Sequence, residues 1–450
     1  MTISEECICA LATPAGGAIG IIRLSGEQAI EITDKIFEAS NGKPLSEAKP
    51  NTIHYGEIKD KNGSTIDDVL VSIFRAPHSY TGENSTEISC HGSRYILQQV
   101  LQCLTESGCR QALPGEYTRR AYMNGKMDLS QAEAVADLIA STNKATHQMA
   151  LSQLKGHFSS ELSRLREQLL KMTSLLELEL DFSDHEELEF ADRSELRELA
   201  EQIDHRITTL AHSFETGNAI KQGIPVAIVG KTNVGKSTLL NRLLHEEKAI
   251  VSDIHGTTRD VIEDTTMIDG ITFRFIDTAG IRQTTDVVEN IGIERTFQKM
   301  DEARIVVWLL DEQPSADEIS EMKSKTHGKK LLKVFNKMDT HSFDMENALS
   351  ISARTGQNIE RLEQSLVKAA DIPEITENDV IVTSARHYEA LLRAGESLSR
   401  VLESMDAGMS GDIIAEDLRV VLEELAEITG GQISSQETLN NIFKHFCIGK

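Results

Sequence analysis

The stretch GKTNVGKS, residues 230 to 237, decides the fold of the central part of this 450-residue chain. It matches the phosphate-loop pattern, directly follows the strand-like run PVAIV at 225 to 229, and opens a helix at Thr238. In such a loop, backbone N–H groups surround a phosphate, Lys236 reaches the β- and γ-phosphates, and the Ser237 hydroxyl ligates Mg²⁺. The expected nucleotide contacts are Gly230, Asn233, Val234, Gly235, Lys236, Ser237 and Thr238.

Two further motifs are expected on the phosphate side of the same site. DTAG, residues 277 to 280, follows a strand-like run that ends at Ile276. A carboxylate there can hold Mg²⁺ through water, and a glycine amide can meet the γ-phosphate. GTTRD, residues 256 to 260, lies in the polar stretch between the two motifs, where Thr258 is expected to close onto the metal. The contacts expected from these motifs are Thr258, Asp277, Thr278, Ala279 and Gly280.

The choice of base is predicted by NKMD at 336 to 339, which follows a strand-like run ending at Phe335. The Asp339 carboxylate can accept from both N1–H and the 2-amino group of guanine, and adenine offers neither donor. A buried carboxylate left unpaired is costly, so this arrangement rejects the wrong base by a factor on the order of 10⁴. The Ala353 amide is expected to meet the guanine O6. The expected base contacts are Asn336, Lys337, Asp339, Ser352 and Ala353.

One residue that orients the attacking water in many GTPases is missing. These proteins place a glutamine after the glycine of the DxxG motif, but Ile281 stands there in this chain. An apolar side chain cannot orient water, so another group must do so. The candidates on the following segment are Arg282, Gln283 and Glu289.

The composition is that of an ordinary soluble protein, with 40% hydrophobic and 26% charged residues. Acidic residues outnumber basic ones by 71 to 46, which gives a net charge of -25 and disfavours autonomous binding to a polyanion. The six cysteines show no zinc-site spacing, which favours reduced thiols in a cytoplasmic protein. We expect no membrane segment, because no apolar run approaches about 18 residues and the N-terminus lacks a signal-peptide pattern.

Periodicity predicts three domains, with α/β and all-α parts. Residues 1–118 mix short strand-like runs with one helical stretch, which is typical of a small α+β domain. Residues 217–372 alternate strands with helices and therefore predict a Ras-like phosphate-loop domain with a parallel sheet. Residues 119–216 and 373–450 follow helical spacing and are expected to form one discontinuous helical domain into which the nucleotide domain is inserted. The acidic run at 181 to 189 is interpreted as a solvated helix junction rather than a metal site.

Several long stretches outside the nucleotide block resemble one family. They are ATPAGGAIGIIRLSG at 12 to 26, APHSYTGENSTEISCHG at 76 to 92, LPGEYTRRAYMNGKMDLSQAEAVADLI at 113 to 139, and the terminal FCIGK. They are similar to the MnmE (TrmE) family of tRNA uridine modification GTPases. Asn233 and GTTRD also resemble the TrmE-Era-like, potassium-dependent branch of translation-factor-like GTPases.

The resemblance implies a homodimer whose residues 1–118 bind 5-formyltetrahydrofolate or a related reduced folate and carry the dimer contact. It implies a heterotetramer with an FAD-dependent MnmG-type subunit, which adds a carboxymethylaminomethyl or aminomethyl group to C5 of the wobble uridine of certain tRNAs. Potassium-stimulated GTP hydrolysis, coupled to dimerisation of the GTPase domains, would drive rearrangement of the complex. The tRNA would be held mainly through the complex, which accounts for the acidic charge of this chain.

The family's functional positions can be placed on this sequence. The implied folate contacts are Arg23, Glu87, Lys126 and Lys450. The implied potassium ligands are Asn233, Ser252, the Ile254 carbonyl and Thr257, and the implied Mg²⁺ ligands are Ser237 and Thr258. Because the resemblance places Ser252 and Thr257 on the potassium ion beside the phosphates, it also makes them nucleotide contacts.

Two further roles come from the resemblance. It makes Glu289 the acid that positions water, ahead of Arg282 and Gln283, and it makes Cys447 a functional cysteine near the one-carbon chemistry. One departure from the family pattern lies in the phosphate loop, where 231 to 232 is Lys-Thr instead of Arg-Pro. Another is Ser93, which replaces the second glycine of a usual His-Gly-Gly.

Two other functions are weighed against tRNA modification. One is a GTP-controlled ribosome assembly factor that modifies nothing, and the other is a dimeric nucleotide switch that acts only on protein partners. The stretches in residues 1–118 and the terminal CIGK favour the modification enzyme. An assembly factor would more naturally carry a basic RNA-binding module, and no strongly basic segment stands out.

Overall fold

The computed structural model describes residues 6–181, 193–245, 264–276, 301–340, 348–373, 376, 378–431, 439, 442–444, 446 and 449. The chain divides into two compact units. The first is Met1–Ala140, Ala150–His205 and Ala390–Lys450, and the second is Ser141–Met149 and Arg206–Glu389. Among the helices that these residues form, none combines the length and apolar character needed to cross a lipid bilayer.

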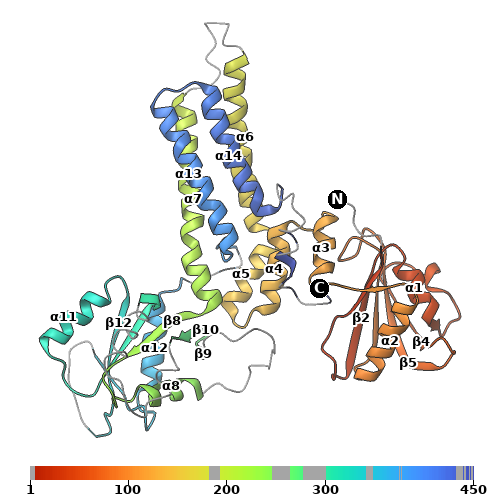
Figure 1. Cartoon of the computed structure of the whole chain (residues 1–450), viewed down its shortest axis with the longest axis horizontal. Helices are drawn as coiled ribbons and strands as arrows, with labels where there is room; N and C mark the ends of the chain where they lie inside the picture. Colours follow the sequence, from red (N-terminus) through yellow and green to blue (C-terminus); the bar gives the residue numbers. More distant parts are fainter. Residues whose placement is uncertain are drawn as a thin grey trace. The chain divides into compact units, whose positions relative to one another are not determined.

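The N-terminal part of the first unit is a seven-stranded sheet with helices on one face (Figure 1). The strand order is β3-β4-β5-β6-β2-β1-β7, and neighbours are antiparallel except β1 and β7. The strands are β1 (Ile8–Leu11), β2 (Ile19–Ser25), β3 (Phe37–Ala39), β4 (Thr52–Lys59), β5 (Thr65–Phe74), β6 (Ser85–His91) and β7 (Arg110–Gln111). The helices are α1 (Ala29–Ile36), α2 (Arg94–Glu106) and the 3₁₀ turn η1 (Leu45–Glu47).

Strand β5 shows why this sheet forms. Val69, Val71 and Ile73 are buried, while Leu70 between them is 46% exposed. Successive side chains of a strand point to opposite faces, so the alternation places one face in the core. The buried face packs against α1 and α2 in one apolar cluster. The α+β organisation predicted for this part of the chain is therefore present.

Long helices make up the rest of the first unit, and three of them, α5, α7 and α13, are divided between the two units. The helices are α3 (Glu116–Met123), α4 (Leu129–Ala140), α5 (Lys144–Leu154), α6 (His157–Asp181), α7 (Arg193–Gln222), α13 (Ala385–Asp406) and α14 (Gly411–Thr429). Helices α6 and α14 lie side by side (Figure 1). The apolar side chains that recur at helical spacing in α6, from Phe158 to Leu176, are buried. Gly156, with φ +83°, separates α5 from α6, because a left-handed residue ends the helix before it.

The second unit holds a six-stranded sheet in the order β13-β12-β11-β8-β10-β9. Its strands are β8 (Ile224–Val229), β9 (Asp264–Ile268), β10 (Ile271–Phe275), β11 (Ile305–Leu310), β12 (Lys330–Phe335) and β13 (Leu349–Ser350). Its helices are α8 (Lys236–His245), α11 (Ala316–Lys325) and α12 (Ile359–Ala370).

The sheet is parallel as predicted except at one edge. Strand β9 pairs antiparallel with β10, whereas the other pairs are parallel. Asp269 and Gly270 connect the two strands with φ values of +51° and +76°. Two consecutive positive φ values form the tight turn whose twist matches a hairpin, and Asp-Gly is a preferred sequence for it. The Asp-Gly signal was present in the sequence and marks the missed strand.

Strand β11 is central in this sheet and is buried on both faces. Ile305, Val307 and Leu309 belong to the apolar cluster that includes α8 and α12. Val306 and Trp308 belong to the cluster that includes side chains of α11. Each fully buried side chain of this size stabilises the fold by about 1.5–3 kcal/mol relative to an exposed one. This burial fixes the strand whose carboxyl end lies beside the candidate site.

The arrangement of two sheets and a set of long helices confirms the multidomain α/β plus α fold class. The residue limits of the three domains stay a prediction, as does the assignment of a folate-binding role to residues 1–118. The described helices beyond Pro373, α13 and α14, follow the helical spacing of the sequence.

Candidate functional site

The phosphate loop connects the end of β8 to the start of α8 and requires glycine at two positions. A Cβ atom on Gly230 would lie 2.3 Å from the Leu309 carbonyl oxygen. A Cβ atom on Gly235 would lie 2.2 Å from the Asn336 side-chain nitrogen, and Gly235 has φ +105°. A side chain would therefore displace the Leu309 backbone at the first position and the buried Asn336 side chain at the second. The loop is packed against the residues that follow β11 and β12.

The Lys236 side chain lies along this loop. Its Nζ donates to the carbonyl oxygens of Gly230 and Lys231, each at 2.7 Å. Burial lowers the pKa of Lys236 below its ordinary value. Asn233 has φ +59°, a left-handed conformation that asparagine adopts more readily than most residues. The Lys236 ammonium is thus held against the carbonyl oxygens of its own loop.

The Asn336 side chain joins three segments of the candidate site. It is 4% exposed, and its Nδ2 donates to the Val234 carbonyl at 2.8 Å. Its Oδ1 accepts from the Ala353 amide at 2.9 Å. The structure therefore brings together the phosphate loop, the residues after β12 and the residues after β13, as the sequence predicts for a nucleotide site.

Asp339 lies beside the segment that follows β13. The buried Ser352 hydroxyl donates to Asp339 Oδ1 at 2.8 Å, and the exposed Arg354 guanidinium donates to Oδ2. The Ser352 hydrogen bond, followed by the Arg354 contact, lowers the pKa of Asp339 below its ordinary value. The carboxylate is therefore ionised at neutral pH and only accepts hydrogen bonds.

Two acidic residues beside this site were missed by the sequence analysis. Asp311 accepts from Lys337 Nζ at 2.6 Å, and Glu312 accepts from Lys231 Nζ at 2.6 Å. Glu318 of α11 lies 3.1 Å from the same Lys231. Their position in the sequence could have indicated them, because both acids directly follow the apolar run that forms β11. Polar residues at the carboxyl ends of parallel strands meet at one edge of the sheet.

Many of the predicted site residues lie outside the described part of the chain, including phosphate, metal and water contacts, the folate contact Lys450 and the functional cysteine Cys447. They are Ser252, Ile254, Thr257, Thr258, Asp277, Thr278, Ala279, Gly280, Arg282, Gln283, Glu289, Cys447 and Lys450. Of the predicted cation ligands, Ser237 and Asn233 are described, and both offer oxygen atoms that suit hard cations. Within the described ranges, no group of three or more His, Cys, Asp or Glu side chains could hold a metal ion.

Two of the predicted folate contacts face each other in the N-terminal sheet. Arg23 of β2 and Glu87 of β6 are directly opposite, and Arg23 Nε and Nη2 reach Glu87 Oε1 at 2.9 and 2.7 Å. The Arg23 guanidinium carbon lies 5.8 Å from the ring centroids of both Tyr80 and Tyr117. The pair is one-fifth to one-quarter exposed. This arrangement places a guanidinium and a carboxylate side by side, with the exposed Tyr80 ring near them and the Tyr117 ring fully buried.

Lys126 contacts the loop that carries Tyr80. Its Nζ donates to the Pro77 carbonyl at 3.0 Å. Near the C-terminus, the Gly449 carbonyl accepts from Arg23 Nη1 at 3.4 Å. The structure therefore brings Arg23 and Glu87 into direct contact, places Gly449 beside them, and holds Lys126 on the neighbouring loop.

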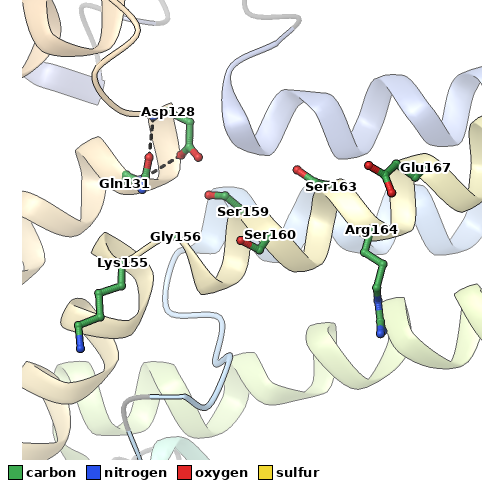
Figure 2. Close-up of a pocket in the computed structure, with 9 residues that line it drawn as sticks. All are labelled: Asp128, Gln131, Lys155, Gly156, Ser159, Ser160, Ser163, Arg164 and Glu167. Carbon is green, nitrogen blue, oxygen red and sulfur yellow. Dashed lines mark hydrogen bonds between the residues drawn. The ribbon is translucent and has the colours of Figure 1, made fainter.

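A polar cleft of about 450 Å³ lies between the start of α4 and the first turns of α6 (Figure 2). Asp128 and Gln131 hydrogen bond to each other at its edge, with distances of 3.0 and 2.9 Å. Charged groups of both signs line it, and no sequence-predicted site residue does. The lining residues are Asp128, Gln131, Lys155, Gly156, Ser159, Ser160, Ser163, Arg164 and Glu167. The cleft is therefore separate from both candidate sites.

Comparison with known proteins identifies two family models and several full-length relatives to which the chain is similar. The MnmE helical domain family matches residues 129–447, and the family described as GTP-binding protein TrmE N-terminus matches residues 7–126. A tRNA modification GTPase MnmE of Phocaeicola vulgatus is 56% identical, with 100% of this chain and 99% of the relative covered. Proteins of the same name from Bacteroides fragilis and Flavobacterium johnsoniae are 57% and 50% identical, with both chains covered completely.

Proposed function

This chain belongs to the MnmE family of tRNA modification GTPases, and from that premise we propose that it is the GTP-hydrolysing subunit of a tRNA-modifying complex. The GTPase class and the link to tRNA modification follow from the family. The finer proposal is that the complex adds a carboxymethylaminomethyl or aminomethyl group to C5 of the wobble uridine of certain tRNAs. The one-carbon unit would come from 5-formyltetrahydrofolate or a related reduced folate.

The observation that carries the GTPase proposal is the position of Asn336. One buried side chain bonds to the phosphate loop at Val234 and to the amide of Ala353. Asn336 thereby sets the distance between the phosphate loop and the segment that is expected to contact the base. A bound nucleotide has to span that distance. Because Asp339 is an ionised acceptor beside Ala353, the base that fits is one with adjacent donors, which is guanine.

Binding of GTP would exchange contacts that the structure contains. Lys236 Nζ, which donates to the Gly230 and Lys231 carbonyls, would turn to the β- and γ-phosphates. The Asp339 oxygen that accepts from Arg354 would accept from guanine, while Ser352 keeps the other oxygen in place. The exposed Arg354 loses little by this exchange, because an ion pair in water contributes weakly.

Hydrolysis requires an oriented water and neutralisation of charge between the β- and γ-phosphates. We assign the water to Glu289, since Ile281 cannot orient it, and Mg²⁺ to Ser237 and Thr258. A potassium ion, held by Asn233, Ser252, the Ile254 carbonyl and Thr257, would supply the neutralising charge. Closure of that loop would also form the surface on which two GTPase domains meet.

The N-terminal sheet is proposed to hold the folate. Arg23 and Lys126 suit the carboxylates of the glutamate tail, and Glu87 suits the donor edge of the pterin. Both Arg23 bonds use Glu87 Oε1, so Oε2 is the oxygen that would address the pterin. The Tyr80 ring, which is 38% exposed and 5.8 Å from the guanidinium carbon, would offer apolar contact to the ligand, whereas Tyr117 is fully buried behind the pair. Lys450 would join this group, since Gly449 already lies beside Arg23.

The proposed assembly is a homodimer that joins an FAD-dependent MnmG-type subunit. The net charge of -25 supports a partner that carries most of the tRNA contacts. Cys447 would act near the one-carbon chemistry rather than in GTP hydrolysis. The competing proposal, a ribosome assembly factor, needs RNA contacts that an acidic chain supplies poorly.

The test is mass spectrometry of wobble nucleosides in tRNA from cells that lack this chain. We expect the carboxymethylaminomethyl and aminomethyl uridines to disappear and to return when the parent gene is restored. Restoration with Cys447→Ser should return GTP hydrolysis but no modified nucleoside. Unchanged nucleosides in the deletion would favour the ribosome assembly factor, and failure to co-purify with tRNA or a flavoprotein would favour a switch that acts on protein partners.

A further inference from the structure

Two consecutive acidic residues lie between the two loops of the nucleotide site. Asp311 and Glu312 follow β11, which stands between β8 and β12 in the sheet. The phosphate loop follows β8, and the base-recognition residues follow β12. Asp311 reaches Lys337 on the base side, and Glu312 reaches Lys231 on the phosphate side. The strand order therefore places one acid beside each loop.

The two ion pairs differ in their surroundings. The side chains of Lys231 and Glu312 are 53% and 64% exposed, so water screens their attraction and their pairing contributes little. The side chains of Lys337 and Asp311 are 40% and 28% exposed, and their atoms are 2.6 Å apart. Both bonds measure 2.6 Å, so the lower exposure of Lys337 and Asp311 makes their pair the stronger of the two.

Lys337 is also held in an uncommon backbone conformation. Its φ is +63°, in the left-handed region that residues other than glycine adopt only when neighbouring contacts enforce it. Both neighbours of Lys337 in the chain make such contacts. The Asn336 side chain hydrogen bonds to Val234 and Ala353, and the Met338 amide donates to the Ile351 carbonyl at 3.1 Å. With the backbone fixed, the remaining freedom of Lys337 is in its long side chain, which Asp311 holds at its end.

We infer that Asp311 is a positioning residue for guanine-nucleotide binding, and that it acts through Lys337. The inference rests on the proposed function, because it assumes that the base-recognition loop binds guanine. Asp311 does not touch the nucleotide. It orders the Lys337 side chain before the nucleotide arrives, so that the rotamer entropy of lysine is not lost on binding. The lysine stem then forms a preformed wall beside the base.

The test compares affinity with turnover in the full chain. We expect Asp311→Ala to weaken binding of both GDP and GTP by about three- to tenfold, the range for one partly exposed charge-assisted bond. The factor is equal for the two nucleotides because Lys337 lies on the base side. At saturating GTP, kcat should stay within about twofold of the parent. Asp311→Asn keeps an acceptor oxygen for Lys337 and should recover part of the loss.

A double-mutant cycle shows whether Asp311 acts through Lys337. Lys337→Met keeps an apolar stem but removes the donor, so Asp311→Ala should weaken binding no further in that background. Asp317→Ala is the matched control, because it removes one exposed acid from the first turn of α11. It should leave both affinities unchanged. A melting curve without nucleotide identifies any variant that has lost its fold, and the near-isosteric Asp311→Asn then carries the comparison.

Three outcomes overturn the inference while the parent still binds guanine nucleotides. They are unchanged affinity in Asp311→Ala, an equal further loss in the Lys337→Met background, and a fall in kcat with affinity preserved. A parent that binds neither GDP nor GTP would instead overturn the proposed function. The titration of the parent thus separates the two failures.

Discussion

The Ser352 hydroxyl donates a hydrogen bond to Asp339 Oδ1 across 2.8 Å, and this bond holds the carboxylate beside the segment that follows β13. Ser352 is fully buried, so its donor has a fixed direction. The bond also lowers the pKa of Asp339, together with the Arg354 contact. A carboxylate that is fixed and ionised can demand two donors from its ligand, and this is the physical basis of base choice.

Asp339→Asn should change that choice. The amide can donate to the 2-oxo group of xanthine, so we expect the ratio of GTP affinity to xanthosine triphosphate affinity to fall by about 10²-fold or more. Competition binding with both nucleotides measures the ratio. Arg354→Ala is the control, because it removes the exposed partner of Asp339 and should leave the preference for guanine intact. Equal GTP affinity in Asp339→Asn and the parent would refute this assignment.

Glu289→Ala should separate binding from hydrolysis. With the water no longer oriented, we expect turnover to fall by about 10²-fold or more while GTP affinity stays near that of the parent. Single-turnover hydrolysis together with equilibrium binding makes the distinction. Arg282→Ala and Gln283→Ala are the matched variants from the same segment. Normal turnover in Glu289→Ala, with a slow Arg282 or Gln283 variant, would move the role to that residue.

Hydrolysis should depend on potassium through Asn233. Neutral oxygen ligands without added carboxylates suit a monovalent ion, and sodium is too small for contacts of the same length. We expect GTP turnover and dimerisation of the GTPase domains to rise together when potassium chloride replaces sodium chloride. Light scattering with GDP and aluminium fluoride reports dimerisation. The idea fails if the two salts give equal rates, or if Asn233→Ala keeps the potassium response.

A reduced folate should stabilise the protein through Arg23, Glu87 and Lys126. A ligand that binds only the folded state raises the free energy of unfolding by mass action, about 2.7 kcal/mol at a hundred times Kd. Thermal unfolding with and without 5-formyltetrahydrofolate measures the shift. Lys126→Ala should reduce it, whereas Lys43→Ala, at an exposed position on the same domain, should not. No shift at saturating folate would count against this pocket.

Glu116 should make the stability of the N-terminal sheet sensitive to acid. Burial alone would raise its pKa, but hydrogen bonds from Arg110 and the Leu113 amide outweigh burial and lower the pKa below its ordinary value of 4.5. Stabilisation from a lowered pKa is present above pH 4.5 and is lost as the pH falls through the folded value. Glu116→Gln should therefore cost about 2 kcal/mol of unfolding free energy at neutral pH and much less in acid.

Hydrogen exchange of β1 and β7 measures the local stability at each pH. Glu106→Gln, at a more exposed carboxyl group at the end of α2, is the control. It should change the local unfolding free energy little, both at neutral pH and in acid. If Glu116→Gln lowers the unfolding free energy by the same amount at pH 7 and in acid, the loss comes from packing and not from the charge of Glu116.

The sequence by itself determined the features that are local along the chain. The phosphate loop could be predicted because a strand, two obligatory glycines and a helix follow one another within a few residues. The family stretches and the helical spacing of α6 and α14 are local in the same sense. The Asp269-Gly270 turn also indicated the hairpin of β9 and β10. The hairpin was missed because strands that alternate with helices predict parallel pairing throughout this block.

Only the tertiary structure decided which distant residues meet. Asp311 and Lys337 are 26 positions apart, and Arg23 and Glu87 are 64 apart. The first pair meets because β11 and β12 are neighbours in the sheet, and the second because β2 and β6 pair in a register that sets the two residues opposite each other. Periodicity predicts that a strand exists and which face it buries, whereas the order and register of strands arise from packing between segments far apart in the chain.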